Sequence, residues 1–492
     1  MTKPIFSVRK MIIVMTTTVF SISSSTTAFF TMGLKSLFWL ALAAILYFLP
    51  FAMMSAEFTS AYPKSSGSLY DWLADSLTPK IAFITTFVWY ASYFVWMTSL
   101  ILRLWIPFGL LVFGRDVSQM PTVFGISTKV VLMLLSLLGL FILTIIINQG
   151  FLKIAKLMYF AAILTTGLVV LIVGLNLVLS FQHPEEILPH IKNAMTSNTF
   201  FETSNLTGFL AQLPFMIFAV TAFGGLDTVS SLVEKIGNQQ HKFSKALLLS
   251  GGLVLVFYFL NIISLCIGTD FAAIHTSSQN HLGNLMYRLM AHLSGQVSTN
   301  ALFREICVRY TALMMFVSYL ALLVTIGYAP LKVLLHASHR LVFPHQLLVR
   351  NKHGIHFKAV QMQALIIGGF IILVSIGMPF VNTLYNHLTL MTNVSRSLPY
   401  LIVACAYPFF KAKFSGEYLK LVHHKSAVKY LSLSVVVMVS VAIVFEIYAT
   451  LISDGLIAGI FLIIGPLFFA LLANYLYGRH ADDNDTFSLS DY

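Results

Sequence analysis

Ser21-Ile22-Ser23-Ser24-Ser25-Thr26-Thr27 interrupts an apolar run from Met11 to Met32 that is long enough to span a bilayer. Small hydroxylated side chains release the backbone from the helical ladder and supply replacement hydrogen bonds. Broken backbone at membrane depth is tolerated only where it lines a cavity inside the protein. The stretch therefore predicts a transporter's binding site within the first membrane span.

The composition is that of a membrane protein. Charged residues make up 10% of the 492 residues and hydrophobic residues 58%, and the mean hydropathy is +0.85. A soluble domain usually carries about 25% charged residues. We therefore expect an all-α polytopic membrane protein. Apolar stretches of at least ~18 residues give twelve candidate spans, at 11–31, 36–62, 80–113, 128–148, 152–181, 206–235, 245–268, 304–343, 358–377, 380–410, 428–452 and 455–478.

The segments between these spans are too short for a separate soluble domain. We expect one transmembrane domain over residues 1–478, followed by a short acidic tail over 479–492. The domain divides into repeats at about 11–181 and 206–410 and two further helices over 428–478. The first apolar run is too long for a signal peptide and lacks a small-residue cleavage pattern, so it should remain as the first helix.

The net charge of +12 would suggest nucleic acid binding in a soluble protein, but its distribution over the loops indicates membrane orientation instead. Inner segments hold 20 of the 30 Lys and Arg residues, outer segments hold seven, and Arg103, Lys332 and Arg396 fall within spans. The positive-inside rule then places both termini in the cytoplasm. The three cysteines have no metal-ligand spacing and imply no disulfide framework, so we expect no metal and no cofactor.

A second interruption occurs in the sixth predicted span, which reads Ala222-Phe223-Gly224-Gly225-Leu226-Asp227-Thr228. Each glycine destabilises a helix by about 1 kcal/mol relative to alanine and exposes backbone groups. Interruptions in spans one and six are what a five-plus-five inverted repeat predicts, with half-helix ends meeting near the bilayer midplane around a substrate. Each interruption alone also has a structural explanation, because serines bond back to their own helix and glycine pairs permit close packing.

Three stretches resemble the amino acid-polyamine-organocation permeases. Residues 43–83 share with that superfamily's second helix and following loop the residues Pro50, Ala56, Glu57, Gly67, Ser68, Trp72 and Pro79. The start of its seventh helix is matched by Glu234, Asn238, Phe243 and Ala246. The segments 329–332, 339–344 and 351–354 are similar to the eighth helix and loop of the bacterial glutamate/γ-aminobutyrate antiporter branch. The resemblance covers about residues 5–478 and implies a LeuT-like fold of about twelve helices in which helices one and six are broken.

The resemblance also implies a substrate site. Ser23, Ser24 and Ser25 would hold the α-carboxylate and amino group of an amino acid in the unwound first helix. In the sixth helix, Phe223 would close over the substrate beside the backbone of Gly224 and Gly225. Other aromatic side chains would face the cavity, although aromatics in such a chain more often pack or face lipid; these are Tyr90 and Tyr93 in the third helix and Tyr328 in the eighth.

This chain departs from the antiporter branch in two places. A run of serines replaces the aromatic and acidic break of the first helix, and only 15 residues follow Tyr477, where the branch has a longer carboxyl-terminal plug. Glutamate specificity and plug-based acid gating are therefore not carried over.

Two ionisable side chains within the spans are candidates for function, because such groups are costly in a membrane and usually face a cavity or a partner. Lys332 matches a cationic residue of the branch and could neutralise a substrate carboxylate or stand in for a coupling cation. It could also pair with a carboxylate such as Glu57, or reach the inner face. Asp227 is a candidate proton site or a structural cap, and Arg103 and Arg396 are interpreted as structural or gate-lining.

Seven histidines belong to predicted inner segments. Imidazole titrates near pH 6.5, so a cytoplasmic group of histidines could sense acidification, whereas a lone surface histidine usually has no function. Their spacing is not a metal motif. The residues are His336, His339, His345, His353, His356, His423 and His424.

Other functional classes lack their signatures. The chain has no phosphate-binding Gly-x-x-x-x-Gly-Lys-Ser/Thr loop of an ATP-driven pump, and no His-Glu-x-x-His or Gly-x-Ser-x-Gly motif of an enzyme. A channel is less favoured, because no filter-like signature or ring of charges is visible. The sequence predicts secondary active transport of amino acids across the cytoplasmic membrane by exchange. Proton-coupled symport of an amino acid or polyamine is the alternative, sodium coupling is least favoured, and both monomer and homodimer stay open.

Overall fold

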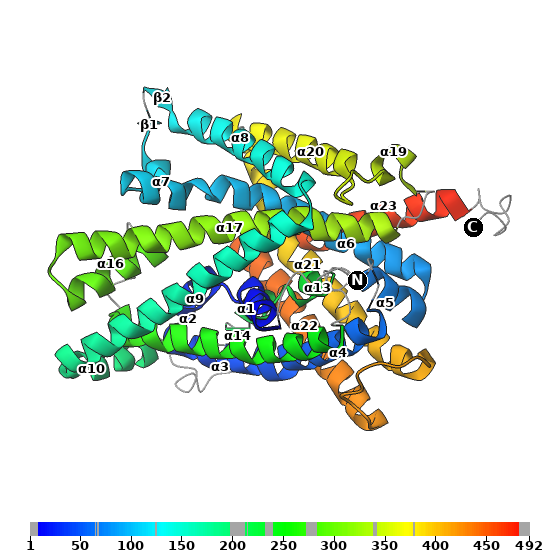
Figure 1. Cartoon of the computed structure of the whole chain (residues 1–492), viewed down its shortest axis with the longest axis horizontal. Helices are drawn as coiled ribbons and strands as arrows, with labels where there is room; N and C mark the ends of the chain where they lie inside the picture. Colours follow the sequence, from blue (N-terminus) through cyan, green and yellow to red (C-terminus); the bar gives the residue numbers. More distant parts are fainter. Residues whose placement is uncertain are drawn as a thin grey trace.

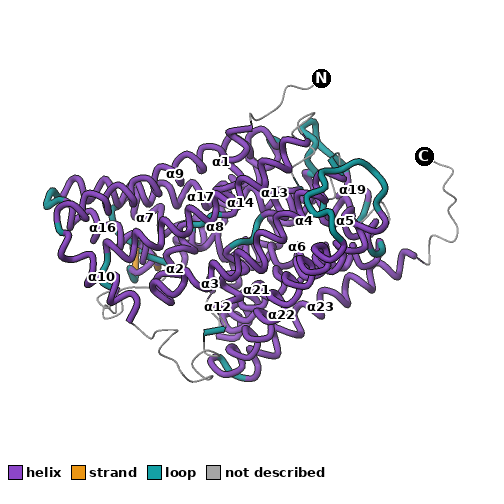
Figure 2. Tube along the Cα trace, turned by 90° about the horizontal axis from the view of Figure 1, so that it is seen from below, coloured by secondary structure: helices purple, strands orange, loops and turns teal. Residues whose placement is uncertain are grey.

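The computed structural model describes residues 8–63, 65, 68–123, 125–196, 212–213, 215–231, 240–271, 283–337, 342–376 and 379–481. Over these residues the chain is a bundle of helices (Figure 2). Strands β1 (Thr122–Val123) and β2 (Ile126–Ser127) form one short antiparallel hairpin. Some residues used above lie outside the described residues, namely Gly67, Glu234, Asn238, His339 and the tail from residue 482.

Nine helical stretches of the described residues are long and apolar enough to cross a membrane. They are Val8–Ala61, Pro79–Phe113, Thr128–Asn148, Phe151–Gln182, Lys242–Gly268, Ala301–Ala337, Phe357–Ile376, Lys425–Ser453 and Leu456–Arg479. The first of them contains two predicted spans, and a shorter apolar helical stretch, Phe215–Ser230, falls within the sixth predicted span. The protein is therefore a mostly helical polytopic membrane protein, and the count of twelve crossings stays a prediction.

The helices of the first half begin with α1 and α2, which together form the first predicted span. Their bounds are Val8–Val19 for α1, Ile22–Met32 for α2, Gly33–Lys35 for η1, Ser36–Ala43 for α3, Ala44–Phe48 for the π-helical η2 and Leu49–Ala61 for α4. There follow α5 (Leu69–Ser76), α6 (Pro79–Arg103), α7 (Trp105–Phe113), η3 (Val117–Gln119), α8 (Thr128–Asn148), α9 (Phe151–Gln182) and α10 (Pro184–Thr196).

The second half begins with two short helices in the sixth predicted span. These are α12 (Phe215–Ala222) and α13 (Leu226–Ser230), followed by α14 (Gln240–Gly268), α16 (Leu285–Val297), α17 (Ala301–Ala337) and α19 (His345–Leu348). The last four helices are α20 (Phe357–Ile376), α21 (Pro379–Lys413), α22 (Lys425–Ser453) and α23 (Leu456–Ala481). Helix α23 thus continues three residues beyond the predicted end of the domain at 478.

Local sequence explains where several long helices begin and end. Thr78 caps α6 by accepting a hydrogen bond from the amide of Ile81 at 3.3 Å, and Pro79 occupies the first turn. Helix α7 ends at Gly114, whose φ of 68° is the left-handed conformation that glycine adopts most easily.

The long helices run side by side, and helices far apart in sequence pack against each other (Figure 1). Helix α1 contacts α9 and α14, α17 contacts α6 and α9, and α21 contacts α6 and α22. Trp89 and Tyr258 are completely buried between these helices. On the outer helices large apolar side chains are exposed, such as Leu365 of α20 at 77% and Ile452 of α22 at 69%. A surface of this kind fits contact with lipid.

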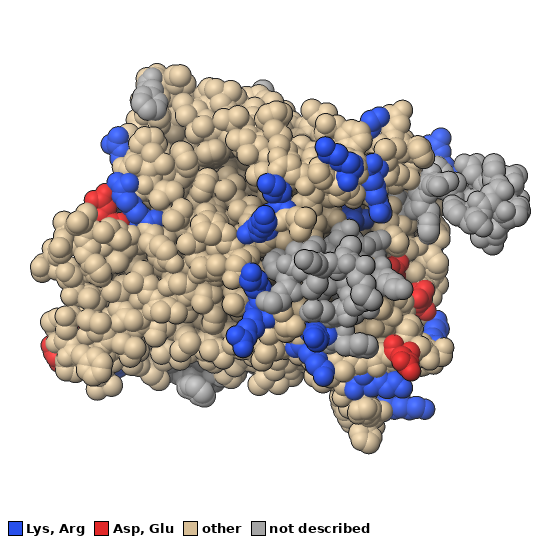
Figure 3. Space-filling view, in the orientation of Figure 1, with Lys and Arg blue, Asp and Glu red and all other residues tan. Residues whose placement is uncertain are grey.

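Positive charge is unevenly distributed along the helices. On the face drawn in Figure 3, most Lys and Arg side chains lie toward the end of the bundle that carries α5 and α19, on the right in Figure 1. Fewer lie toward the end that carries α10 and α16. This asymmetry agrees with the predicted inner and outer loops, and the cytoplasmic position of the termini stays a prediction.

Candidate functional site

The first helix is broken at Phe20 and Ser21, between α1 and α2. Ser21 has extended backbone (φ −125°, ψ 122°), and its hydroxyl accepts a hydrogen bond from the amide of Ser24 at 3.3 Å, so it is the N-cap of α2. This cap leaves the amides of Ile22 and Ser23 without a partner among the described residues. The interruption was expected, but its position is corrected: the non-helical residues precede Ser23, and the serines from Ser23 to Ser25 form the first turn of α2.

The threonines that precede the break already bond to their own helix. The hydroxyls of Thr16, Thr17 and Thr18 donate to backbone carbonyls of the preceding turn over 2.8, 3.0 and 2.7 Å. Such back-bonding weakens and bends helices, which explains why α1 ends here.

The second broken helix has its interruption where the glycines predict it. Helix α12 ends at Ala222 and α13 begins at Leu226, with Phe223, Gly224 and Gly225 between them. Gly225 has a φ of 119°, which an L side chain rarely adopts. The prediction of non-helical backbone at Gly224 and Gly225 is confirmed.

The two breaks lie next to each other. A Cβ placed on Gly225 would lie 3.5 Å from the carbonyl oxygen of Thr18, at the end of α1. Tyr258 of α14 joins the breaks: its hydroxyl donates to the carbonyl of Ala222 over 2.8 Å and accepts from the amide of Ser21 over 3.4 Å. Backbone groups released by each interruption are thus held by one buried phenol. Sequence analysis missed Tyr258, because no local pattern distinguishes it from the other tyrosines of the chain.

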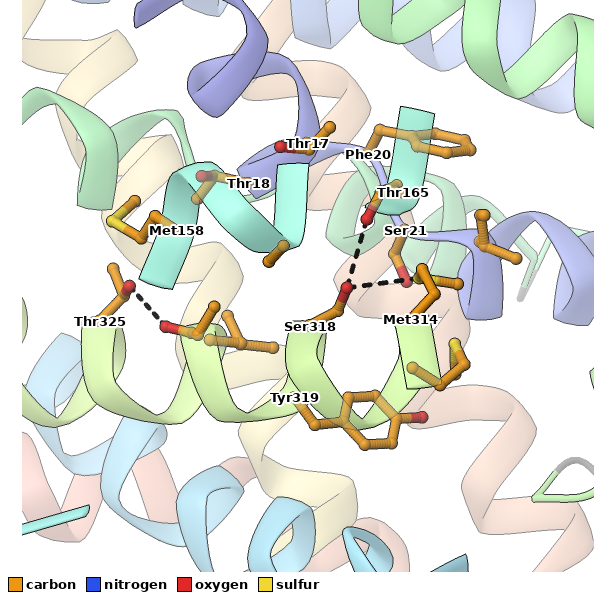
Figure 4. Close-up of a pocket in the computed structure, with 15 residues that line it drawn as sticks. Thr17, Thr18, Phe20, Ser21, Met158, Thr165, Met314, Ser318, Tyr319 and Thr325 are labelled. Atoms are coloured by element: carbon orange, nitrogen blue, oxygen red, sulfur yellow. Dashed lines mark hydrogen bonds between the residues drawn. The ribbon is translucent and has the colours of Figure 1, made fainter. Parts of the chain in front are cut away.

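A cavity of about 90 Å³ borders the first break, and its lining exposes more apolar than polar surface (Figure 4). It lies between the α1–α2 junction, α9 and α17, and hydroxyl groups from all three sides line it, namely those of Thr17, Thr18, Ser21, Thr165, Ser318, Tyr319 and Thr325. The hydroxyl oxygens of Thr165 and Ser318 lie 3.2 Å apart across the cavity, and Ser318 also donates to the sulfur of Met314 over 3.3 Å. Hydroxyls can donate and accept, so this wall can bind either polar end of a small ligand.

The three predicted serines lie beside this cavity and do not line it; Ser21 and Ile22 do. Ser25 is completely buried, donates to the carbonyl of Ile22 over 2.9 Å and accepts from the side-chain amide of Asn261. Ser23 is half-buried. Ser25 is therefore engaged with protein groups.

Asp227 lies at the second break with several donors around it. It is 2% exposed, and the indole nitrogen of Trp89 lies 2.5 Å from its Oδ2, while the amide of Gly225 donates to Oδ1 over 3.1 Å. The hydroxyls of Tyr93 and Tyr400 are each 3.4 Å from one of its oxygens. Asp227 thus links α6 and α21 to the break, and Tyr93 also contacts the hydroxyl of Thr228 at 3.0 Å.

Three predicted aromatic residues occupy packed positions. Phe223 stacks on Phe48 with ring centroids 4.7 Å apart and meets Tyr258 edge-on at 5.3 Å. Tyr90 donates to the side-chain oxygen of Gln363 over 2.9 Å. The ring of Tyr328 lies below the ammonium of Lys332, 6.0 Å away, and 6.4 Å from the ring of Phe151. Of these, only Phe223 is at a break, and none lines the cavity.

Lys332 holds the end of the second broken helix. It is 5% exposed, and its ammonium donates to the carbonyl of Ser231 over 2.6 Å, at the C-terminal cap of α13. A cation is favourable there because the helix dipole places partial negative charge at that end. Glu57 is not its salt-bridge partner: Glu57 bonds to Tyr407 at 2.8 Å and to Lys411 at 2.9 Å.

The described residues contain no group of three or more His, Cys, Asp or Glu side chains that could hold a metal ion. The described polar groups around the breaks include hydroxyls, backbone amides and carbonyls, the side-chain amide of Asn261, the indole of Trp89, the carboxylate of Asp227 and the guanidinium of Arg396. Such an arrangement can bind a zwitterion, but it has no nucleophile paired with a base.

The sequence matches known membrane transporters along most of its length. The family model described as Amino acid permease matches residues 6–472. The inner membrane transporter YjeM of Salmonella typhimurium is 33% identical over 484 residues, which cover 96% of this chain and 95% of that protein, and YjeM of Escherichia coli is 32% identical with the same coverage. The aspartate/glutamate permease AcaP of Lactococcus lactis subsp. cremoris is 23% identical over 378 residues, 75% of this chain and 72% of that protein.

Proposed function

This chain belongs to the amino acid permease family, and on that premise we propose that it is a secondary active transporter of amino acids in the inner membrane. The family implies a LeuT-like fold, and the protein is not an enzyme. We extend this to twelve crossings, an inverted repeat of helices one to five against six to ten, and cytoplasmic termini.

The observation that carries this proposal is the meeting of the two broken helices. The N-terminus of α2 offers the amides of Ile22 and Ser23 and the positive end of its dipole, which suit an α-carboxylate. Carbonyls at the end of α1 suit the amino group, and the carbonyl of Thr18 lies against Gly225. A zwitterion bound between them would have both charges satisfied by backbone groups.

The cavity beside the first break offers hydroxyl groups from three sides and so supports a small polar ligand at this position. Its volume of about 90 Å³ is well below the roughly 300 Å³ at the lower end of ligand pockets. We infer that this conformation is closed around the site, and that alternating access widens the space between α1, α9 and α17.

For coupling, we propose exchange of one amino acid for another, as in the antiporter branch that the sequence resembles. Proton-coupled symport of an amino acid or polyamine is the second candidate. It is favoured by Asp227, a buried carboxylate next to the break that could carry a proton between the two sides of the membrane. The name of AcaP indicates that acidic amino acids are carried by one relative.

Uptake by purified protein in proteoliposomes tests this proposal. Vesicles preloaded with single amino acids are offered labelled ones, with and without a pH gradient, and protein-free vesicles are the control. Counterflow that needs no gradient supports exchange, whereas accumulation only with an inward proton gradient supports symport. Absence of amino acid or amine uptake under every condition contradicts the proposal.

A further inference from the structure

Arg396 of α21 lies against the second helix break. A Cβ placed on Gly224 would be 3.4 Å from one of its terminal nitrogens. The guanidinium carbon is 4.2 Å from the ring centroid of Trp96 and 5.7 Å from that of Tyr93, both on α6. A cation therefore lies in the middle of α21, beside one of the two breaks between which the proposed function places the substrate.

Among the described residues, no carboxylate lies within ion-pair distance of this charge. No ion pair between described residues includes Arg396, and its Nε is buried without a hydrogen-bond partner. Asp227, at the same break, is near enough to attract Arg396 electrostatically, but its hydrogen bonds come from groups such as Trp89 and Gly225. An arginine at membrane depth is unfavourable unless something compensates its charge, and such residues usually mark a substrate path or a pairing site.

The stacking on Trp96 prepares the guanidinium for a ligand. Contact with the face of the Trp96 ring restrains the plane of the guanidinium. The edge of the guanidinium, with its row of N–H donors, stays available. That edge matches the two oxygens of a carboxylate better than any other ligand group in a protein does.

The distance from the first break to Arg396 suits one amino acid. A Cβ placed on Gly225 would lie 3.5 Å from the carbonyl oxygen of Thr18, and one placed on the adjacent Gly224 would lie 3.4 Å from Arg396. Consecutive Cα atoms are about 3.8 Å apart, so a ligand held at the first break needs only a short side chain to reach the guanidinium. Arg396 does not line the 90 Å³ cavity, so this contact requires the closed space to open toward Gly224.

We propose that Arg396 binds the side-chain carboxylate of a dicarboxylic amino acid and selects this class of substrate. The inference rests on the proposed function, because it assumes that the α-amino and α-carboxylate groups bind at the breaks. With both carboxylates bound, the substrate has a net charge of −1, which Arg396 neutralises.

Selectivity of uptake tests the inference. Labelled glutamate and aspartate are compared with glutamine and asparagine in proteoliposomes of the parent, Arg396→Gln and Arg396→Lys. We expect the parent to prefer the dicarboxylic acids. Arg396→Gln should weaken their apparent affinity at least tenfold while leaving the amides unchanged or better, and Arg396→Lys should recover part of the loss. Arg304→Gln, which removes an exposed arginine at the start of α17, should behave as the parent.

Two results would overturn the inference and leave the proposed function intact: a parent that carries neutral but not dicarboxylic amino acids, or equal loss of both classes in Arg396→Gln. If the parent carries no amino acid, the proposed function itself fails. Arg396 could instead only balance the charge of Asp227. The double variant Asp227→Asn with Arg396→Gln tests this role, because it removes both charges together. Restored dicarboxylate uptake there would contradict substrate binding by Arg396. If Arg396→Gln does not fold, Arg396→Lys alone must still weaken dicarboxylates selectively, because lysine lacks the two-pronged edge.

Discussion

The hydroxyl of Tyr258 lies 2.8 Å from the carbonyl oxygen of Ala222, so a side chain from α14 holds the end of α12 where the sixth predicted span breaks. The same oxygen is 3.4 Å from the amide of Ser21 in the other broken helix. One phenol therefore connects the two interruptions, and α14 holds them next to each other.

Tyr258→Phe should impair transport without unfolding the protein. The change leaves two buried backbone groups unpaired, which costs roughly 1–3 kcal/mol per group. Amino acid uptake should fall about tenfold or more, since 1.4 kcal/mol corresponds to a factor of ten. Tyr310→Phe is the matched control, because it removes a bond of similar length, 3.0 Å to the carbonyl of Leu164, away from the breaks. Equal uptake by the two variants would argue against the connecting role.

Gly225→Ala should destabilise the closed site. A side chain at a φ of 119° is strained by roughly 1–3 kcal/mol. The melting temperature of the purified protein and its uptake should both fall. Gly252→Ala, in the interior of α14 with nothing within 4 Å of the added Cβ, should be neutral or slightly stabilising. If both variants melt at the same temperature, the left-handed conformation of Gly225 is not needed.

Lys332→Met should lower both stability and transport. It removes a charged hydrogen bond to the carbonyl of Ser231, worth about 1.5–3 kcal/mol. Lys332→Arg keeps the charge and should retain part of the activity. Lys352→Met, on an exposed loop position, serves as the control. The measurement is uptake from pH 5 to 8 with a parallel melting curve, and a methionine variant that transports like the parent throughout would exclude a role in function.

We expect the stability of the protein to depend on pH through His356, which lies in the loop before α20. Burial, followed by the charge of Arg350, lowers the pKa of His356, whose Nδ1 lies 2.9 Å from the carbonyl oxygen of Leu348. An unfolded histidine titrates near 6.5. Below about pH 6.5, the histidine of the unfolded protein binds a proton while that of the folded protein stays neutral. The free energy of unfolding therefore falls as the pH drops from about 6.5 toward the lower pKa of the folded state.

The melting temperature should therefore fall less on acidification in His356→Gln than in the parent. His345→Gln, at the exposed start of α19, should follow the parent curve. Identical curves for His356→Gln and the parent would show that this imidazole does not contribute.

The sequence predicted the membrane class and both interruptions from local chemistry. The glycine pair predicts the position of the second break at Gly224 and Gly225, because a φ of 119° at Gly225 is accessible mainly to glycine. The serine run misplaces the first break, because hydroxyls also cap and support a helix: Ser21 begins α2, and Ser25 bonds within its first turn. The number of twelve spans stays a prediction, because the described residues contain nine helical stretches that are long and apolar enough to cross a membrane.

The parts of the site that sequence analysis missed depend on long-range contacts. Ser21 and Tyr258 are 237 residues apart, and Thr165 and Ser318 are 153 apart. Tyrosine and threonine within an apolar span give no periodic signal of which cavity they face. Lys332 was recognised as unusual from its cost in a membrane, but its partner, a backbone carbonyl of α13, could be found only from the fold.

The most direct test of the central claim, that the two breaks bind the amino acid backbone, is a cryo-EM structure with the transported amino acid bound. We expect the α-carboxylate about 2.7–3.2 Å from the amides of Ile22 and Ser23, and the amino group at the carbonyls beside Gly225. Ligand density away from both breaks, with these amides bonded only to protein groups, would contradict it.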